Sequence, residues 1–310
     1  MIVTVTLTPA LDKTVVLPGF RVDQVNRIES LRLDPGGKGI NVSKVLRSLG
    51  TKSLATGILG GGTGKYIEDS LTALGIACDF VHVPQETRTN LKVVDPQLHT
   101  NTDINEPGAP ADEDTLEAVF QTAQAAAAAP GSIVVLAGKA PAGTRDTVFA
   151  EWIARLKEKG VRVYMDADAG LLAEGVKARP ALIKPNDAEL GRLTGQSFAS
   201  VDDIAQAARE LASGGIETVV VSLGGEGALF VTAEQTIRGY GLRVPVQSTV
   251  GAGDSMMAAM AHGAATGMTF RDTCALAMAV SAAAVTTPGT QPADADIVAG
   301  LLKQVRLEEI

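Results

Sequence analysis

The most informative stretch of the chain is Ser-Thr-Val-Gly-Ala-Gly-Asp-Ser-Met-Met at 248–257. Three small residues, Gly251, Ala252 and Gly253, stand directly before one carboxylate, Asp254, and an apolar stretch of helical type follows. Small residues at a helix start leave backbone N–H groups open, and the helix dipole adds positive potential, so such a start suits an anion. An anion site beside a carboxylate that can accept a proton is what phosphoryl transfer to a sugar hydroxyl requires. The alternative is a glycine-rich turn in which Asp254 only caps the helix.

A second glycine-rich segment, Pro-Gly-Gly-Lys-Gly-Ile-Asn at 35–41, precedes another helical pattern. Its glycines permit close approach of a ligand to the backbone. Lys38 supplies a positive charge, and the amide of Asn41 can donate and accept hydrogen bonds with sugar hydroxyls. A tight turn closed by a capping asparagine is the alternative. Asp12 follows the first strand pattern, so we expect it at the carboxyl end of a strand, where parallel sheets bind ligands.

The commonest nucleotide-binding motifs are absent. The nearest match to a Walker A loop ends in Gly64-Lys65, but Leu59 stands at its first glycine position and Tyr66 replaces the hydroxyl residue. The dinucleotide fingerprint fails because Met256 stands where its third glycine belongs. The signature tripeptides of protein kinases do not occur. A phosphate-transferring enzyme with this sequence must therefore use another architecture.

The composition indicates a soluble α/β enzyme. Apolar residues make up 45% and aromatic residues only 4% of the chain, and 27 Lys and Arg stand against 35 Asp and Glu, a net charge of −8. This balance argues against a nucleic-acid partner or an anionic membrane. The N-terminus lacks the basic segment of a signal peptide, and no apolar run is long enough to span a membrane. Two cysteines and three histidines without ligand spacing predict free thiols in a cytoplasmic protein and no histidine-based metal site.

Strand and helix patterns alternate along the chain. We expect strands in the short β-branched runs at 2–8, 53–58, 133–137, 161–166, 181–184 and 218–223. We expect helices between them, at about 41–49, 65–74, 113–128, 145–159, 201–212 and 255–265. Continuous apolar strands joined by helices predict a mostly parallel sheet that is covered on both faces. In such a sheet, ligands bind at the carboxyl ends of the strands.

Two segments interrupt this alternation, at about 13–34 and 87–106. Both contain strand patterns with no helix between them, and the second contains a turn at Asp95-Pro96. We expect them to form a small four-stranded sheet inserted into a single domain of residues 1–310. Such a sheet can close over an active site and exclude water. Its exposed edges also favour a homodimer through this sheet, whereas two unrelated surface hairpins are the alternative.

Six motifs stand in an order that resembles the ribokinase-like (PfkB) carbohydrate kinases over essentially the whole chain. They are Thr-Leu-Thr-Pro-Ala-Leu-Asp (6–12), Gly-Gly-Lys-Gly-Ile-Asn-Val (36–42), Thr-Arg-Thr-Asn-Leu-Lys-Val (87–93), Lys-Pro-Asn-Asp-Ala-Glu-Leu (184–190), Val-Ser-Leu-Gly-Gly-Glu-Gly-Ala (221–228) and the 248–256 segment. The resemblance implies the ribokinase-like fold and an ATP- and Mg²⁺-dependent kinase. Its acceptor would be a ketohexose phosphate: D-fructose 1-phosphate, phosphorylated at O6, is expected, and tagatose 6-phosphate is the alternative.

The resemblance also implies a role for each motif. Asp254 would take the proton from the acceptor hydroxyl, and the amides of Gly251, Ala252 and Gly253 would stabilise the transferred phosphoryl group. The residues implied to hold the sugar phosphate are Asp12, Gly36, Gly37, Lys38, Asn41, Arg88, Asn90 and Lys139. Those implied to hold the nucleotide are Lys184, Ser222, Gly224, Gly227 and Thr249, with the adenine near Ala279–Pro288. Asn186 and Glu189 would organise Mg²⁺, often through water, although the same spacing fits a helix-capping box and both roles are compatible.

Two positions depart from the family pattern. Lys139 stands where a substrate-side serine is frequent, and Asp166-Ala167-Asp168 stands where Asp-Ser-Ser is frequent. Lys139 either adds a contact to a phosphate or points to solvent. Two further alternatives are a kinase of an unphosphorylated sugar or nucleoside, and a non-catalytic sensor of sugar phosphates. Arg88 and Lys38 disfavour the first because a neutral acceptor needs no cations, and Asp254 disfavours the second because a sensor needs no base.

Overall fold

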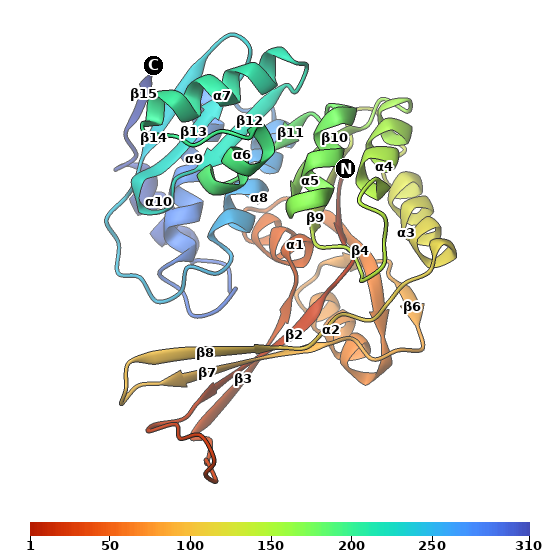
Figure 1. The fold of residues 1–310 in the computed structure, drawn as a ribbon, viewed down its shortest axis with the longest axis vertical. Helices are drawn as coiled ribbons and strands as arrows, with labels where there is room; N and C mark the ends of the chain where they lie inside the picture. The colour runs from red at the N-terminus through yellow and green to blue at the C-terminus, as the bar shows by residue number, and fades with distance from the viewer.

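The main body is built on one large sheet with helices on both of its faces (Figure 1). The computed structural model describes residues 1–310. The strand order is β15-β14-β13-β12-β11-β10-β9-β1-β4-β5, and β6 pairs with β4 beside this path. The bounds are β1 Ile2–Thr6, β4 Ser53–Gly60, β5 Ala77–Cys78, β6 Val81–Val83, β9 Ile133–Gly138, β10 Arg162–Ala167, β11 Leu182–Ile183, β12 Thr218–Ser222, β13 Gly227–Val231, β14 Thr236–Tyr240 and β15 Leu307–Glu309.

Pairing is parallel from β5 to β12 and antiparallel from β12 to β15. The central strands are mostly apolar because both faces of the sheet are covered. All residues of β1 and of β9 are buried. The α/β class with a mostly parallel sheet, expected from the sequence, is therefore confirmed, and the antiparallel extension β13–β15 is an addition to it.

Two large apolar cores fill the two sides of the sheet. One core packs α3, α4, α5, α6 and α7 against the strands, and the other packs α1, α8 and α9. The helices are α1 Lys38–Ser48, α2 Gly61–Ala73, α3 Glu113–Ala126, α4 Val148–Lys157, α5 Ala169–Gly175, α6 Asp187–Thr194, α7 Val201–Ser213, α8 Ala252–Thr266, α9 Phe270–Ala284 and α10 Ala295–Leu302. None of these helices is long and apolar enough to cross a bilayer.

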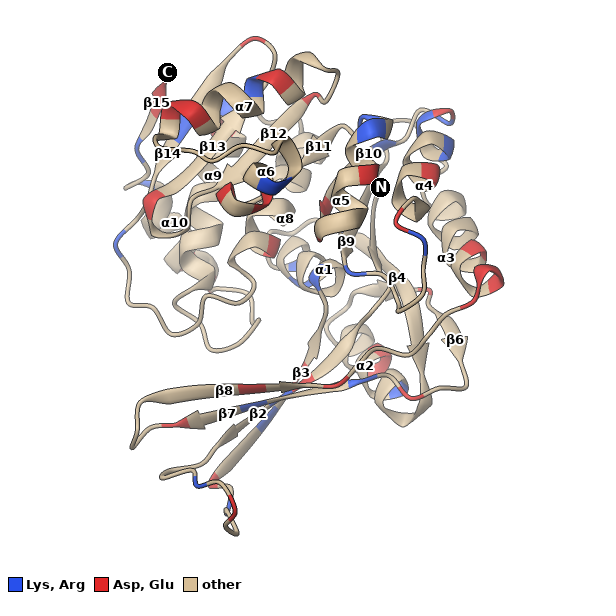
Figure 2. Ribbon diagram, in the orientation of Figure 1, with Lys and Arg blue, Asp and Glu red and all other residues tan.

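A separate four-stranded sheet, here called the lid, projects from the main body (Figure 1). Its strands are β2 Ala10–Val16, β3 Ser30–Gly36, β7 Thr89–Asp95 and β8 Thr100–Asn105, in the order β3-β2-β7-β8. The β2–β7 pair is parallel and the other two pairs are antiparallel. The two segments expected to form a small sheet thus lie side by side. Figure 2 shows both basic and acidic residues in the lid, and its strands include Lys13 on β2 and Asp103 on β8.

Candidate active site

A cleft of about 1070 Å³ lies between the lid and the carboxyl edge of the main sheet. Its walls come from the lid, the start of α1, the ends of β9 and β10, the 246–254 segment and the 288–290 loop. Twelve of the residues predicted from sequence line it: Asp12, Gly37, Lys38, Asn41, Arg88, Asn90, Lys139, Lys184, Thr249, Gly251, Gly253 and Asp254. The fold thus gathers into one cavity side chains that are up to 242 positions apart in the sequence.

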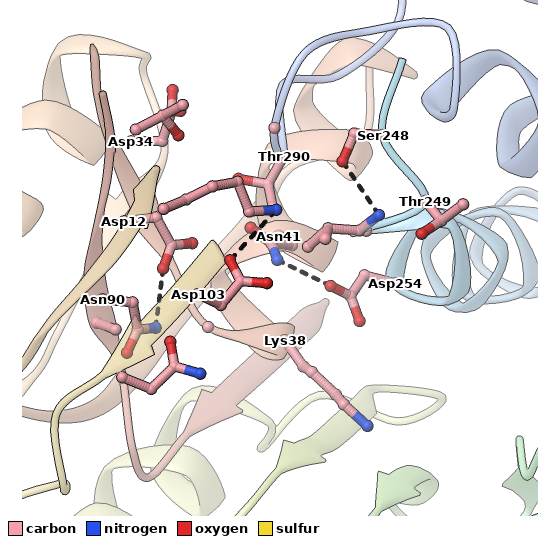
Figure 3. Close-up of a pocket in the computed structure, with 18 of the residues that line it drawn as sticks. Asp12, Asp34, Lys38, Asn41, Asn90, Asp103, Ser248, Thr249, Asp254 and Thr290 are labelled. Atoms are coloured by element: carbon pink, nitrogen blue, oxygen red, sulfur yellow. Dashed lines mark hydrogen bonds and ion pairs between the residues drawn. The ribbon is translucent and has the colours of Figure 1, made fainter. Parts of the chain in front are cut away.

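Asp254 lies in the first turn of α8 and is buried in the floor of this cleft. Asn41, on α1, donates a hydrogen bond of 2.8 Å from Nδ2 to Oδ2 of Asp254 (Figure 3). Burial, with the nearby negative charge of Asp166, raises the pKa of Asp254 to about 6, while Asn41, Lys38 and Lys184 act in the opposite direction. A carboxyl group with a pKa near neutrality is suited to general acid–base chemistry.

The N-terminus of α8 is open toward the same cleft. Gly251 is the N-cap with φ of 85°, a left-handed conformation that glycine adopts without strain. No side chain caps this helix, so its first amides have no capping partner within the chain. A Cβ on Gly253 would lie 2.9 Å from Nζ of Lys184, so the glycine lets the lysine approach the helix start. Free amides, the helix dipole and an ammonium group together form a site for an anion.

Three lysines and two aspartates form a row of alternating charge along the cleft, here called the charge row: Lys139, Asp168, Lys38, Asp166 and Lys184. Successive nitrogen–oxygen distances along it are 3.5, 3.3, 3.1 and 3.0 Å. Parallel pairing of β9 with β10 brings their carboxyl ends together; Asp166 lies at the penultimate position of β10, and Asp168 follows the strand directly.

The buried end of the charge row is held in its ionised form. Burial opposes the charge on Asp166, but Lys184 and Lys38 outweigh it and keep the pKa of Asp166 below its usual value. Burial would likewise lower the pKa of Lys38, yet Asp166 and Asp168 raise it instead. Asp254 therefore lies near charges of both signs: Asp166 raises its pKa, and Lys38 and Lys184 lower it.

Two asparagine amides, one on α1 and one on the lid, present unpaired acceptors to the cleft. Asn90 donates a hydrogen bond of 2.9 Å from Nδ2 to Oδ1 of Asp12 (Figure 3). The Oδ1 atoms of Asn41 and Asn90 are buried and accept no hydrogen bond. A buried acceptor without a partner is costly, so a ligand that donates hydroxyl hydrogens would satisfy both. Gly36 lies behind this group, since a Cβ there would overlap the carboxylate of Asp12.

Arg88 and Lys139 are two further cations in the lining of the cleft. Arg88 donates to the backbone oxygens of Thr8 (3.2 Å) and Glu106 (3.4 Å), and its buried Nε has no partner. The side chain of Lys139 is 69% exposed and pairs with Asp168. The hydroxyl of Thr8 donates to the backbone oxygen of Lys139 at 3.2 Å, so Thr8 contacts the Arg88 side chain and the Lys139 backbone.

The remaining sequence-predicted residues lie outside the cleft lining. Asn186 and Glu189 form a capping box at the start of α6, with bonds of 2.7 and 2.9 Å between backbone and side chain. Ser222 forms an isolated bridge with Asn186. Gly224 has φ of 59° and open space around it, whereas Gly227 is required because a Cβ would overlap the backbone oxygen of Gly239. Ala252 is the first residue of α8.

The capping box of Asn186 and Glu189 leaves one carboxylate oxygen that could bind a metal ion. One carboxylate oxygen of Glu189 caps Asn186, and the other makes no hydrogen bond within the chain. No group of three or more histidine, cysteine or acidic side chains could hold a metal by itself. These donors fit Mg²⁺, which keeps several waters and binds through one or two carboxylates together with substrate phosphates.

Two buried charged residues of the site, Lys44 and Asp166, were not predicted from the sequence as site residues. Lys44 on α1 donates from Nζ to the backbone oxygen of Pro35 at 2.9 Å and to Oγ1 of Thr290 at 3.0 Å. Burial lowers its pKa to about 8. The signal was a charged residue on the apolar face of a helix. Asp166 entered the sequence analysis only as part of the Asp-Ala-Asp departure from the family pattern. A carboxylate near the end of an apolar strand is itself a signal of a ligand site.

Comparisons with known proteins agree with this geometry. The profile described as "pfkB family carbohydrate kinase" matches residues 6–296. The chain is 36% identical over 309 residues to a 1-phosphofructokinase of Rhodobacter capsulatus, covering 100% of this chain and 98% of the relative. It is 34% identical over 310 residues to the enzyme of the same name in Haemophilus influenzae, with coverage of 100% and 98%. A crystal structure of phosphofructokinase-2 from Escherichia coli in complex with substrates and products superposes with a TM-score of 0.92, at 30% identity and 98% coverage of each chain.

Proposed function

The chain belongs to the pfkB family of carbohydrate kinases, and we propose that it transfers the γ-phosphoryl group of ATP to O6 of D-fructose 1-phosphate. The product is D-fructose 1,6-bisphosphate. One observation carries the proposal: a buried carboxyl with a pKa near 6 stands beside an uncapped helix N-terminus, in a cleft that also holds cations. The full-length similarity to 1-phosphofructokinases supports this choice of acceptor.

Asp254 acts as the general base. Its carboxylate accepts the proton of the acceptor hydroxyl while the hydroxyl oxygen attacks the γ-phosphorus in line with the departing ADP oxygen. Asn41 holds the carboxylate through its 2.8 Å hydrogen bond and so fixes the oxygen that receives the proton. The amides of Gly251, Ala252 and Gly253 stabilise the negative charge of the transferring group.

The sugar phosphate lies against the lid. Asp12, Asn41 and Asn90 hold the sugar hydroxyls, because two of their oxygens are buried acceptors without partners, and Gly36 and Gly37 let them approach. Arg88 binds the phosphate already on the sugar, because its guanidinium matches phosphate oxygens and its Nε is free. Lys38 and Lys139 add positive charge at this end.

The nucleotide occupies the side of the cleft away from the lid. Lys184 approaches the phosphates at the helix start, and Thr249 lines the same wall. Ser222, Gly224 and Gly227 extend this surface toward the ribose, and the adenine lies near Ala279–Pro288. Asn186 and Glu189 organise Mg²⁺, which when bound supplies charge neutralisation for the phosphate oxygens.

The lid excludes water and joins two copies of the chain. Its closure would keep ATP from hydrolysis while the acceptor is bound. Its edge strand β8 is exposed throughout, and Leu31 and Ile104 are about half exposed. Exposed strand edges and apolar side chains favour pairing with a second copy, so we propose a homodimer through the lid.

Tagatose 6-phosphate is the second candidate acceptor, since the same residues can hold it with its ends exchanged. The test of the proposed function is an assay of ADP release that depends on fructose 1-phosphate, with the product identified by ³¹P NMR. The proposal predicts fructose 1,6-bisphosphate from the wild type and almost none from Asp254→Asn. Absence of turnover with the folded wild type would reject this acceptor.

A further inference from the structure

The exposed end of the charge row contains a carboxylate in a place where anions are expected to bind. Asp168 lies between two lysines, with Oδ1 at 3.3 Å from Nζ of Lys38 and Oδ2 at 3.5 Å from Nζ of Lys139. A carboxylate beside a phosphate site repels the ligand unless its own charge is compensated. The role assigned above to Lys139 does not explain this acidic residue.

The two halves of the charge row differ in how firmly they are held. Asp166 is buried and pairs with Lys38 and Lys184. Loss of either partner would leave a buried charge uncompensated and would destabilise the fold. Asp168 is 33% exposed and Lys139 is 69% exposed, so their pair is a weak surface interaction. When Lys139 leaves, Asp168 keeps its bond to Lys38. The Lys139–Asp168 pair is therefore the one contact in the row that can open at low cost.

Lys139 and Arg88 converge on one end of the cleft. Thr8 accepts a hydrogen bond from Arg88 through its backbone oxygen and donates to the backbone of Lys139 through its hydroxyl. Arg88, Lys38 and Lys139 carry three positive charges against one on Asp168, because Asp166 is also compensated by Lys184. These three cations outnumber the single carboxylate of Asp168 between them, so the group favours a phosphate anion.

We propose that Asp168 is a specificity-determining residue of the sugar-phosphate subsite. In the empty cleft it holds Lys139 by an ion pair, and a phosphate dianion on the acceptor displaces it and takes Lys139 together with Arg88. A neutral sugar cannot displace the carboxylate of Asp168. Lys139 then stays paired with Asp168, and the neutral sugar gains no contact with Lys139. This inference rests on the proposed function only in that the acceptor carries a phosphate.

The test is the affinity of this subsite for inorganic phosphate, measured by isothermal titration calorimetry with the nucleotide side saturated by Mg·AMP-PNP. Asp168→Asn keeps the size of the side chain and removes the charge that competes for Lys139. Because an exposed ion pair is worth under about 1 kcal/mol, we expect the dissociation constant of phosphate to fall about two- to fivefold. Lys139→Met should weaken binding, and Asp168→Asn should bring no gain in that background.

A matched control is Glu158→Gln, which removes the same charge from an exposed residue outside the cleft and should leave phosphate affinity unchanged. Unchanged or weaker phosphate binding in Asp168→Asn, or an equal gain without Lys139, would overturn the inference. If Asp168→Asn does not fold, Asp168→Ser replaces it, because serine also removes the competing charge, and the same gain in phosphate affinity is expected. Phosphate binding does not depend on which acceptor is turned over, so a failed assay with fructose 1-phosphate is a separate result.

Discussion

Replacing Asp254 by asparagine should abolish most of the activity and, at neutral pH, stabilise the fold. Asparagine has the same size and keeps an oxygen that can accept the hydrogen bond from Nδ2 of Asn41. It cannot accept the proton of the acceptor hydroxyl, so kcat should fall by about 10²- to 10⁴-fold, the usual contribution of a general base. Binding of ATP should persist, because Asp254 is not among the residues proposed to hold the nucleotide.

The gain in stability follows from the raised pKa of this carboxyl group. Its pKa rises from 3.8 to about 6, and at about 1.4 kcal/mol for each pH unit the ionised group costs the folded state about 3 kcal/mol. This cost is absent below pH 3.8, grows as the pH rises, and is complete above about pH 6. The free energy of unfolding of Asp254→Asn should therefore exceed that of the wild type by about 2–3 kcal/mol at pH 8, and the difference should shrink toward pH 4.5.

Two measurements check this prediction. Urea unfolding of both proteins at pH 4.5 and pH 8 gives the difference in stability, and the ADP-release assay gives kcat. The kcat/KM of the wild type should also rise with pH and level off above an apparent pKa of about 6. A variant that keeps more than a tenth of wild-type kcat would refute the role of Asp254 as the base. A stability difference that does not change with pH would refute the raised pKa.

Three further predictions concern the walls of the cleft. Arg88→Ala should raise KM for the sugar phosphate about tenfold or more and leave KM for ATP unchanged; an unchanged sugar KM would place the phosphate elsewhere. Gly253→Ala should lower kcat, because its Cβ would lie 2.9 Å from Nζ of Lys184 at the anion site, and wild-type kcat would contradict the proposed use of these amides. Lys44 has a pKa lowered to about 8 by burial, so the folded state disfavours its charge, and wild-type stability relative to Lys44→Met should rise as the pH increases from 7 to 9.5. Denaturant unfolding at both pH values measures this, and a constant difference would show that Lys44 titrates normally.

The central part of the fold could be predicted from the sequence because its strands are continuous apolar runs. Such runs at 2–8, 133–137 and 161–166 contain β1 and all but the last residue of β9 and of β10. The helix α9 was not predicted, since it is buried on nearly all sides and shows no alternation of apolar and polar faces. The start of α1 was placed at 41, whereas the helix begins at Lys38, because Gly37 is its N-cap without a capping side chain.

The pairings within the site could not be predicted from spacing. Lys38 and Asp166 are 128 positions apart, and only the adjacent ends of α1 and β10 bring them together. Lys139 and Asp168 each depart from the family pattern, and the sequence gives no reason to connect them. The fold explains both departures at once, since the parallel pairing of β9 and β10 places the two residues at one edge, where they form an ion pair.

The choice of acceptor is tested by comparing kcat/KM with Mg·ATP for fructose 1-phosphate, tagatose 6-phosphate and fructose 6-phosphate under one set of conditions. We expect fructose 1-phosphate to lead by tenfold or more, about 1.4 kcal/mol of preference in the transition state. A lead for tagatose 6-phosphate would keep the mechanism and change the acceptor. Absence of turnover with all three would contradict the central claim that this cleft phosphorylates a ketohexose phosphate.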